Sequence, residues 1–377
     1  MALRGVKVLE IAGLAPAPFC GMVLADFGAS VVRVDRTGFS PDADVLSNGK
    51  RSIAINLKSP KGVDLLKKLC KTSDVLIEPF RKGVMERLGL GPSVLMEKNP
   101  QLIYARLTGF GQTGCYSEKA GHDINYVAMS GVLSILGGKA ERLTPPVNLA
   151  ADFGGGGLMC ALGIVLALYA RNSLHRGQVV DCDMVGGCAY LASWLLRSQN
   201  IPLLWGQPRG CNILDGGAHF YNTYETKDGR WLAVGALEPQ FYEDLLQGLG
   251  LPDIPQYPDN FEESMRIFTE KFKEKSLEEW IKIFEPLDAC VTPVLSLAEA
   301  ADHPHNKACG SFLPSTEEVV PSPAPHLSVT PGVGASSRPR PQIGQHTRLV
   351  LREVGISNGD IEALLREGVV KCGDNKL

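Results

Sequence analysis

Short apolar runs alternate with helical patterns through the first part of the chain. Runs typical of β-strands lie at residues 6–13, 31–35, 74–80 and 102–110. Ser59 and Pro60 predict a helix start, after which apolar residues recur at helical spacing. Right-handed crossovers turn such a repeat into a parallel sheet with helices on both faces. The pattern therefore predicts an α/β, Rossmann-like large domain.

The pattern changes after about residue 200. Two alternating strands joined around Asp228 and Gly229 predict a hairpin, and Ser276 with Glu279 forms a capping-box pattern. Further on, a segment rich in proline and serine without periodicity predicts an extended connector. We therefore expect a large domain over residues 1–200 that residues 330–377 complete, a smaller α+β domain over 201–313, and a connector over 314–341.

Residues 153–170 form an uncharged stretch between Asp152 and Arg171. This length only just reaches the roughly 18 residues of a membrane-spanning helix. Four leading glycines weaken helix propensity. We expect a helix buried inside a soluble core and no membrane span.

Composition excludes several classes of protein. With 44% apolar residues, 21% charged residues and a net charge of −3, the chain is neither disordered nor fibrous, and it lacks the basic excess of a nucleic-acid-binding protein. The 10 cysteines lie at irregular spacings without a CxxC pair, which favours reduced thiols and no metal site. The loop at residues 12–21 lacks GxGxxG, which disfavours NAD.

Of the 7 histidines, His122 has the most suggestive surroundings. Gly121 precedes it, and Asp123 is placed as the N-cap of an apolar helix. The positive end of that helix favours a neutral imidazole that can act as a base, although the adjacent carboxylate acts in the opposite sense. A catalytic histidine and an ordinary surface histidine both remain open at this point.

Asp152 comes immediately before four glycines in NLAADFGGGG. An ordinary helix cap is one interpretation, because aspartate is among the commonest N-cap residues. The glycines favour a second interpretation, in which a ligand lies against the main chain.

Basic residues gather in the loops expected after the strands: Arg33, Arg36, Lys50, Arg51, Arg81 and Lys82. Ligands of open α/β sheets bind at the carboxyl ends of strands, and guanidinium groups suit phosphate oxygens. The arrangement favours a phosphorylated ligand, with scattered positive surface as the alternative.

Several longer segments of the chain form a distinctive set: VLEIAGLAPAPFCGMVLADFGASVVRVDR, IYARLTGFGQTG, AGHDINY, NLAADFGGGG and DACVTPVL. These segments resemble the α-methylacyl-CoA racemases of the family III CoA-transferase superfamily. The resemblance covers most of the chain. It implies an interlocked homodimer, each subunit having a large Rossmann-like domain and a smaller one, with an active site where the two subunits meet.

The resemblance also implies roles for particular residues. His122 and Asp152 correspond to the catalytic pair, and Glu238 is implied as a neighbour of that pair. Contacts with CoA are implied for Arg36, Ala54, Ile55, Asn56, Leu57, Lys58, Arg81 and Arg87. By the same resemblance, the residues expected to line the thioester pocket are Gly121, Asp123, Ile124, Asn125 and Tyr126.

Racemisation of a 2-methylacyl-CoA needs one group that removes the α-proton and another that returns a proton to the opposite face. His122 and Asp152 suit these roles, so we expect an isomerase of branched-chain fatty acid and bile-acid intermediates. Proton transfer needs neither a metal nor a redox cofactor, and CoA arrives as part of the substrate. Two alternatives remain: a CoA-transferase that uses Asp152 as acyl acceptor, and a non-catalytic acyl-CoA-binding protein.

The final residues, Asn375-Lys376-Leu377, resemble the peroxisomal address Ser-Lys-Leu with asparagine in place of serine. The other end lacks an obvious Arg-rich presequence, although the resemblance allows a mitochondrial pool. We expect a peroxisomal location, with a mitochondrial one also open.

Overall fold

The computed structural model describes residues 1–38, 44–139, 142–313, 318–334 and 338–373. The chain divides into two compact units. Unit 1 comprises Met1–Val132, Pro146–Leu191 and Gly310–Leu377, and unit 2 comprises Leu133–Pro145 and Ala192–Cys309. The boundary predicted after residue 200 therefore falls a short way inside unit 2, which also takes in Leu133–Pro145 from the segment predicted as large domain.

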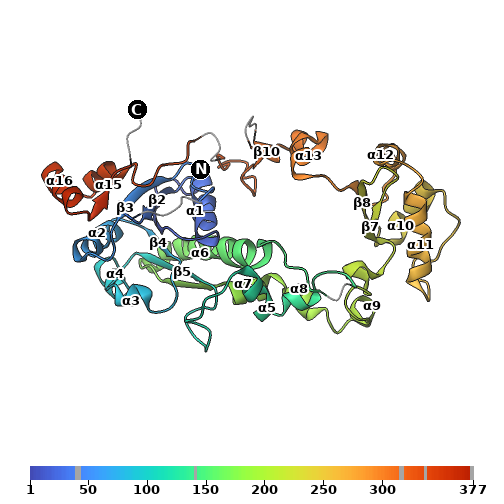
Figure 1. The fold of residues 1–377 in the computed structure, drawn as a ribbon, viewed down its shortest axis with the longest axis horizontal. Coiled ribbons are helices and arrows are strands. Elements are labelled where there is room, and N and C mark those ends of the chain that lie inside the picture. The colour runs from blue at the N-terminus through green and yellow to red at the C-terminus, as the bar shows by residue number, and fades with distance from the viewer. Residues whose placement is uncertain (39–43, 140–141, 314–317, 335–337, 374–377) are drawn as a thin grey trace. The chain divides into compact units, whose positions relative to one another are not determined.

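A seven-stranded sheet forms the centre of unit 1, in the order β12-β3-β2-β1-β4-β5-β6. Its strands are β1 (Lys7–Ile11), β2 (Ser30–Asp35), β3 (Arg51–Ile55), β4 (Val75–Glu78), β5 (Ile103–Thr108), β6 (Val179–Asp183) and β12 (Val370–Lys371). Four of these strands, β2, β3, β4 and β5, are labelled in Figure 1. All neighbours pair in parallel except β12, which joins β3 antiparallel. The predicted parallel sheet is therefore confirmed.

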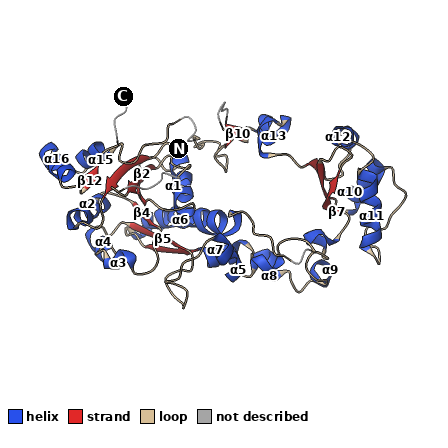
Figure 2. Cartoon of the chain, in the orientation of Figure 1, coloured by secondary structure: helices blue, strands red, loops and turns tan. Residues whose placement is uncertain are grey.

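Helices cover both faces of this sheet (Figure 2). One face packs against α2 (Pro60–Lys71), α4 (Pro92–Lys98), α15 (Thr347–Glu353) and α16 (Asn358–Arg366). The other face packs against α1 (Pro16–Asp26) and α6 (Met159–Leu174). Successive side chains of a strand point to opposite faces of the sheet. Leu9 and Ile11 therefore pack on the face covered by α2, α4, α15 and α16, while Glu10, between them, faces α1.

A π-helix, Leu149–Leu158, leads directly into α6. Together they form a segment long and apolar enough to cross a membrane, yet one such helix is weak evidence of a span. Cys160, Ala161 and Ile164 are buried, whereas Leu166 and Tyr169 are 58% and 78% exposed. The expectation of a helix buried within the core is therefore wrong for one face of α6, because no other element of the described chain covers these apolar side chains.

Unit 2 contains a three-stranded antiparallel sheet of β7 (Tyr221–Glu225), β8 (Trp231–Gly235) and β9 (Val291–Pro293). The hairpin predicted at Asp228 and Gly229 is confirmed. Helices α10 (Pro239–Leu249), α11 (Phe261–Phe272) and α12 (Leu277–Phe284) bury an aromatic core against it. The capping box of Ser276 and Glu279 begins α12, as predicted.

The remaining elements are short. They are α3 (Val84–Arg87), α5 (Asp123–Met129), α7 (Met184–Leu191), α8 (Ser193–Arg197), α9 (Pro202–Trp205), α13 (Leu297–Asp302), α14 (Pro304–Cys309), β10 (Phe312–Leu313), β11 (Val320–Pro321), the 3-10 helix Val132–Ile135 and the π-helix Ile213–Gly217. The predicted connector is not wholly extended coil, because β11 pairs antiparallel with β10. Residues 314–317 and 335–337 of that connector lie outside the described residues.

Candidate active site

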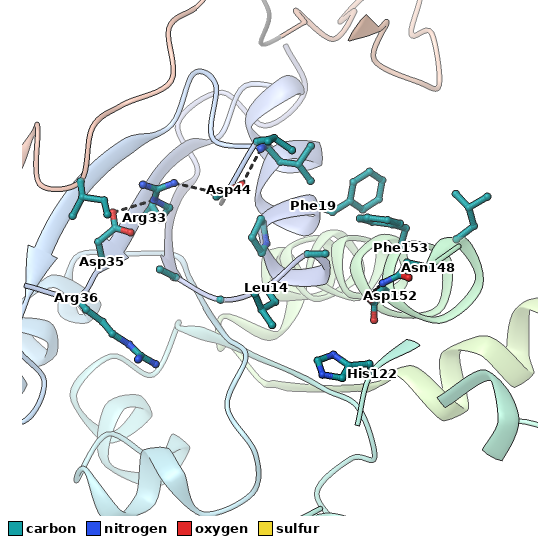
Figure 3. Close-up of a pocket in the computed structure, with 18 residues that line it drawn as sticks. Leu14, Phe19, Arg33, Asp35, Arg36, Asp44, His122, Asn148, Asp152 and Phe153 are labelled. Carbon is teal, nitrogen blue, oxygen red and sulfur yellow. Dashed lines mark hydrogen bonds and ion pairs between the residues drawn. The ribbon is translucent and has the colours of Figure 1, made fainter. Parts of the chain in front are cut away.

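A cavity of about 850 Å³ opens in unit 1 at the carboxyl ends of β1 and β2 (Figure 3). Its lining combines the loop after β1, the first turn of α1, the end of β2 and two later segments that carry His122 and Asp152. Ligands of open α/β sheets bind at this edge. The structure thus brings both predicted catalytic residues to one cavity, which we call the catalytic pocket.

His122 is the N-cap of α5. Its backbone is extended, its side chain is exposed, and its amide donates a hydrogen bond to Oδ1 of Asn125 at 3.0 Å. The prediction that Asp123 caps this helix is wrong by one residue. The physical reason is that the Asp123 carboxylate accepts hydrogen bonds from elsewhere in the chain.

Asp123 connects the two halves of the candidate site. Its side chain is buried, and Oδ1 accepts hydrogen bonds from the amides of Ala151 and Asp152 at 2.9 and 2.8 Å. These amides lie in the first turn of the π-helix, where free N–H groups attract a negative charge. The residue next to one proposed base therefore fixes the backbone of the other.

Asp152 lies inside the π-helix and is buried. Asn148, the N-cap residue, adopts a left-handed backbone with φ of 67° and donates from Nδ2 to Oδ2 of Asp152 at 2.8 Å. The interpretation of Asp152 as an ordinary helix cap is therefore wrong. Its carboxyl group is instead held by the cap residue.

The pKa of Asp152 is raised above its ordinary value, chiefly because burial removes water from the carboxylate. The negative charge of Asp123 acts in the same direction. The hydrogen bond from Asn148 and the charge interaction with His122 act in the opposite direction. Because a raised pKa favours the protonated carboxyl group, this environment suits a proton donor.

The four glycines after Phe153 serve packing within the protein. A Cβ atom on Gly155 would lie 2.4 Å from the amide nitrogen of Cys188 in α7, and one on Gly157 would lie 2.7 Å from Cδ1 of Phe19 in α1. These positions let the π-helix lie directly against two neighbouring helices. The contacts of Gly155 and Gly157 thus indicate helix packing, and not the close approach of a ligand that we expected.

The residues around His122 differ in exposure. Asp123 and Tyr126 are buried, Gly121 is half-buried, and Ile124 and Asn125 are exposed. The Tyr126 hydroxyl donates to the carbonyl oxygen of Gly121, and burial raises the pKa of that hydroxyl to about 12. This bond fixes the turn before His122, whereas the predicted contacts of these residues with a thioester remain predictions.

Two of the basic side chains are already paired and buried. Arg33 lies within β2, not in a loop, and forms ion pairs with Asp35 and Asp44, each at 3.0 Å. Lys50 forms a buried ion pair with Glu10 at 2.8 Å. The expectation that Arg33 lies in a loop is wrong, although this side chain does line the catalytic pocket. Both cations already have carboxylate partners, and the expected phosphorylated ligand stays a prediction.

Other predicted CoA-binding residues are accessible. Arg36 is exposed and lines the catalytic pocket, and Arg81 and Arg87 are exposed after β4. Ala54 and Ile55 are buried within β3, followed by half-buried Asn56 and Leu57 and exposed Lys58. Only the latter part of that stretch can present side chains to a ligand.

Glu238 belongs to unit 2, where it is the N-cap of α10. Its predicted place beside the catalytic pair remains a prediction. Within the described part of the chain, there is no cluster of three or more histidine, cysteine, aspartate or glutamate side chains that could hold a metal ion.

Among the residues of the catalytic pocket that the sequence did not indicate are Phe19, Asn148 and Phe153. Phe19 and Phe153 pack edge to face with ring centroids 5.3 Å apart, and Asn148 holds Asp152. The four-residue spacing of Asn148 and Asp152, which suits neighbours on a helix, was the one available signal. The contact between Phe19 and Phe153 joins distant segments, so the sequence held no signal for it.

Comparisons with known proteins indicate the family of the chain. The family model for CoA-transferase family III matches residues 3–347. The human protein named alpha-methylacyl-CoA racemase is 54% identical over 100% of this chain and 99% of its own length. The human succinyl-CoA:glutarate CoA-transferase is 29% identical over 98% of this chain and 90% of its own.

A solved structure provides an independent comparison of the fold. The crystal structure of a CAIB/BAIF family protein from Brucella suis covers 93% of this chain and 99% of its own, with a TM-score of 0.77. Because its sequence is only 23% identical, this likeness supports the fold alone.

Proposed function

The chain belongs to CoA-transferase family III, and we propose that it is an isomerase that interconverts (2R)- and (2S)-2-methylacyl-CoA thioesters. The observation that carries this proposal is the presence of His122 and Asp152 in one cavity, in a chain 54% identical to a racemase throughout its length. The identity to a CoA-transferase is much lower, at 29%.

The proposed reaction is a transfer of two protons across one carbon atom. Neutral His122 accepts the α-proton from one face, and the electron pair of the C–H bond moves into an enolate of the thioester. Protonated Asp152 then donates a proton to the opposite face of that carbon. Reversal of these roles converts the other enantiomer, so the net reaction consumes no proton.

The raised pKa of Asp152 supports its role as the initial acid. Burial disfavours the carboxylate there, while His122 is exposed on its extended N-cap. For the enolate oxygen we propose first-turn amides of α5 near Asp123 as donors, because charge that develops in a transition state is stabilised by fixed dipoles. The chemistry requires no metal or redox cofactor.

For the CoA part of the substrate we propose contacts with exposed cations at the carboxyl edge of the sheet. Arg36 lines the catalytic pocket, and Arg81, Arg87 and Lys58 are also exposed beyond strand ends. The strand order 3-2-1-4-5-6 within the sheet supports a Rossmann-like interpretation of unit 1. A phosphorylated ligand along this edge would be consistent with that architecture.

We also propose a homodimer. Support comes from large apolar side chains that are exposed on α6 and on α8, among them Leu166, Tyr169 and Trp194. Exposed apolar groups gathered on helices are typical of surfaces that another chain covers. Interlocking of the two subunits and the role of Glu238 at their junction remain part of this proposal.

Peroxisomal location, with a possible mitochondrial pool, is a further proposal and rests on the final three residues, which lie outside the described residues. The proposed metabolic setting is the breakdown of branched fatty acids and the synthesis of bile acids. Separate assays with a branched fatty acyl-CoA and a sterol side-chain acyl-CoA would show which substrate class is preferred.

Acyl-CoA incubated with the protein in heavy water tests the reaction directly. We expect deuterium at the α-carbon, loss of optical purity, and no transfer of CoA to an added free acid. Transfer without α-deuterium would support the alternative in which Asp152 accepts an acyl group. Absence of both reactions, with acyl-CoA still bound, would support a non-catalytic binding protein.

A further inference from the structure

Residues 79–90 connect β4 with α4 and carry Arg81 and Arg87, two of the cations proposed for CoA. We call this segment the arginine loop. Its helix, α3, has four residues, and Gly83 and Gly89 on either side adopt left-handed backbones with φ of 80° and 68°. Because a helix this short is not stable alone, contacts from elsewhere must fix the conformation of the arginine loop.

Arg106 of β5 supplies the central contact. Its register partner on β4 is Glu78, whose Oε1 accepts a hydrogen bond from Nε of Arg106 at 2.9 Å. Both terminal nitrogens of Arg106 donate to the carboxylate of Glu86 in α3, at 2.8 and 3.2 Å. Two parallel bonds of this kind fix orientation as well as distance. Arg106 therefore ties α3 to the sheet.

Two further hydrogen bonds hold the ends of the arginine loop. At its start, the amide of Phe80 donates to Oε2 of Glu78 at 2.9 Å. At its end, the hydroxyl of Tyr104 donates to the carbonyl oxygen of Leu90 at 2.9 Å. Tyr104 lies two residues before Arg106 on β5, and such residues share one face of a strand. One face of β5 thus holds both α3 and the end of the loop.

The side chain of Arg106 is not available to a phosphate. It is only 9% exposed, and it faces the carboxylates of Glu78 and Glu86. Burial raises the pKa of Glu78 to about 7, although the hydrogen bond from Phe80 and the charge of Arg106 act in the opposite direction. When both carboxyl groups are ionised, two negative charges surround one positive charge, so the cluster repels an anion. Any contribution to binding CoA must therefore come from position and not from attraction.

We propose that Arg106 and Glu86 are positioning residues for the CoA contacts of the arginine loop. Their ion pair fixes α3, so that Arg81 and Arg87 can approach the phosphate oxygens of CoA together. Arg87 directly follows Glu86, and Arg81 directly follows Phe80, whose amide is held. This inference rests on the proposed function, which assigns the two CoA contacts, and deepens it by naming what holds them in place.

Glu86→Ala tests the proposal, because positioning and simple attraction predict opposite results. If charge alone mattered, removal of a negative charge beside cations would strengthen the binding of an anion. We expect instead that the Kd of free CoA, measured by calorimetry, rises about tenfold, as for the loss of one hydrogen bond to a charged group. Glu97→Ala, at an exposed position of α4, makes the same charge change and is the matched control. Because exposed charges are screened, its Kd should stay within about twofold of the unmodified protein's.

Two thioester substrates locate the effect within CoA. For 2-methylbutanoyl-CoA, Glu86→Ala should raise KM about tenfold and change kcat less than about twofold, since it removes binding that ground state and transition state share. The 2-methylbutanoyl thioester of pantetheine lacks the nucleotide, so its kcat/KM should change less than about twofold. Glu86→Gln keeps one acceptor oxygen for Arg106, and its Kd for CoA should lie between those of the unmodified protein and Glu86→Ala.

Arg106→Lys tests the other partner of the ion pair. Lysine keeps the positive charge but cannot bind two oxygens of one carboxylate in parallel. We expect a similar rise in the Kd of CoA, and the double variant with Glu86→Ala should be weaker than either single variant by less than about twofold, because both substitutions break one interaction. The Glu86 side chain is 44% exposed, so the result for Glu86→Ala does not depend on the folding of Arg106→Lys.

Unchanged or stronger binding of CoA by Glu86→Ala would overturn the inference, as would an equal loss of activity with the pantetheine thioester. Failure of the unmodified protein to exchange the α-proton of 2-methylbutanoyl-CoA would instead contradict the proposed function. In that case the comparison of Kd values for free CoA would still decide whether the ion pair positions the arginine loop.

Discussion

The two proposed bases are presented by different kinds of local structure. His122 is on the extended N-cap of a short helix and is exposed to water. Asp152 is buried within a π-helix, with its backbone held by Asp123 and its side chain by Asn148. The difference teaches how one cavity can hold a base and an acid together: the solvated group can accept a proton while the desolvated carboxyl group retains one.

Removal of either reacting group should have the largest effect. We expect His122→Ala or Asp152→Ala to lower the racemisation rate by about 10²- to 10⁴-fold, the usual contribution of a general acid or base. Binding of CoA, measured by calorimetry, should change little because neither side chain belongs to the proposed cationic edge. Full racemase activity in either variant would contradict the assigned roles.

Asp123→Ala should have the next largest effect, since it frees the π-helix from α5. Two buried amides lose their acceptor, and a shift of about 1 Å in a reacting group can lower the rate about 10²-fold. We expect kcat to fall more than KM rises. An unchanged kcat would show that Asp123 is not a positioning residue.

Asp123→Asn is the matched control, because its amide oxygen can still accept both hydrogen bonds while the charge is lost. The Asp123 charge raises the pKa of Asp152, so its removal should lower that pKa. The part of the pH–rate profile that requires protonated Asp152 should therefore move to lower pH. A shift to higher pH would contradict this electrostatic account.

Gly155→Ala should destabilise the packing of the π-helix that carries Asp152 against α7. The new methyl group would lie 2.4 Å from the backbone nitrogen of Cys188, and overpacking of this kind costs about 1–3 kcal/mol of unfolding free energy. Calorimetry should show a lower Tm. Gly138→Ala, where a Cβ meets no atom within 4 Å, should leave the Tm nearly unchanged.

Asn148→Gly should have the smallest effect of these substitutions on the racemisation rate. Glycine suits the left-handed backbone at this position but cannot donate to Asp152. Because that hydrogen bond stabilises the carboxylate, its loss should raise the pKa of Asp152 further and move the same part of the pH–rate profile to higher pH. The maximal rate should change less than about tenfold. A downward shift would show that Asn148 does not stabilise the charged form.

Local sequence signals predicted local structure well. The turn at Asp228 and Gly229 and the capping box at Ser276 depend on neighbouring residues, and both are confirmed. The strand and helix rhythm likewise predicted the parallel sheet, because each element carries its own apolar pattern.

Signals failed where partners come from distant parts of the chain. Lys50 was interpreted as a loop cation, yet it pairs with Glu10, 40 residues earlier. Asp123 was interpreted as a cap, yet its carboxylate binds the amide of Asp152, 29 residues later. In each case the residue type indicated a charge, whereas only the fold determines which group that charge contacts.

Exchange of the α-proton by single-base variants tests the central claim most directly. Each pure enantiomer of 2-methylbutanoyl-CoA is incubated in heavy water with His122→Asn or Asp152→Asn, and α-deuterium is measured by mass spectrometry. The account predicts that each variant still exchanges one enantiomer and that the two variants exchange opposite ones, because the bases face opposite sides of the carbon. Exchange of the same enantiomer by both variants would contradict it.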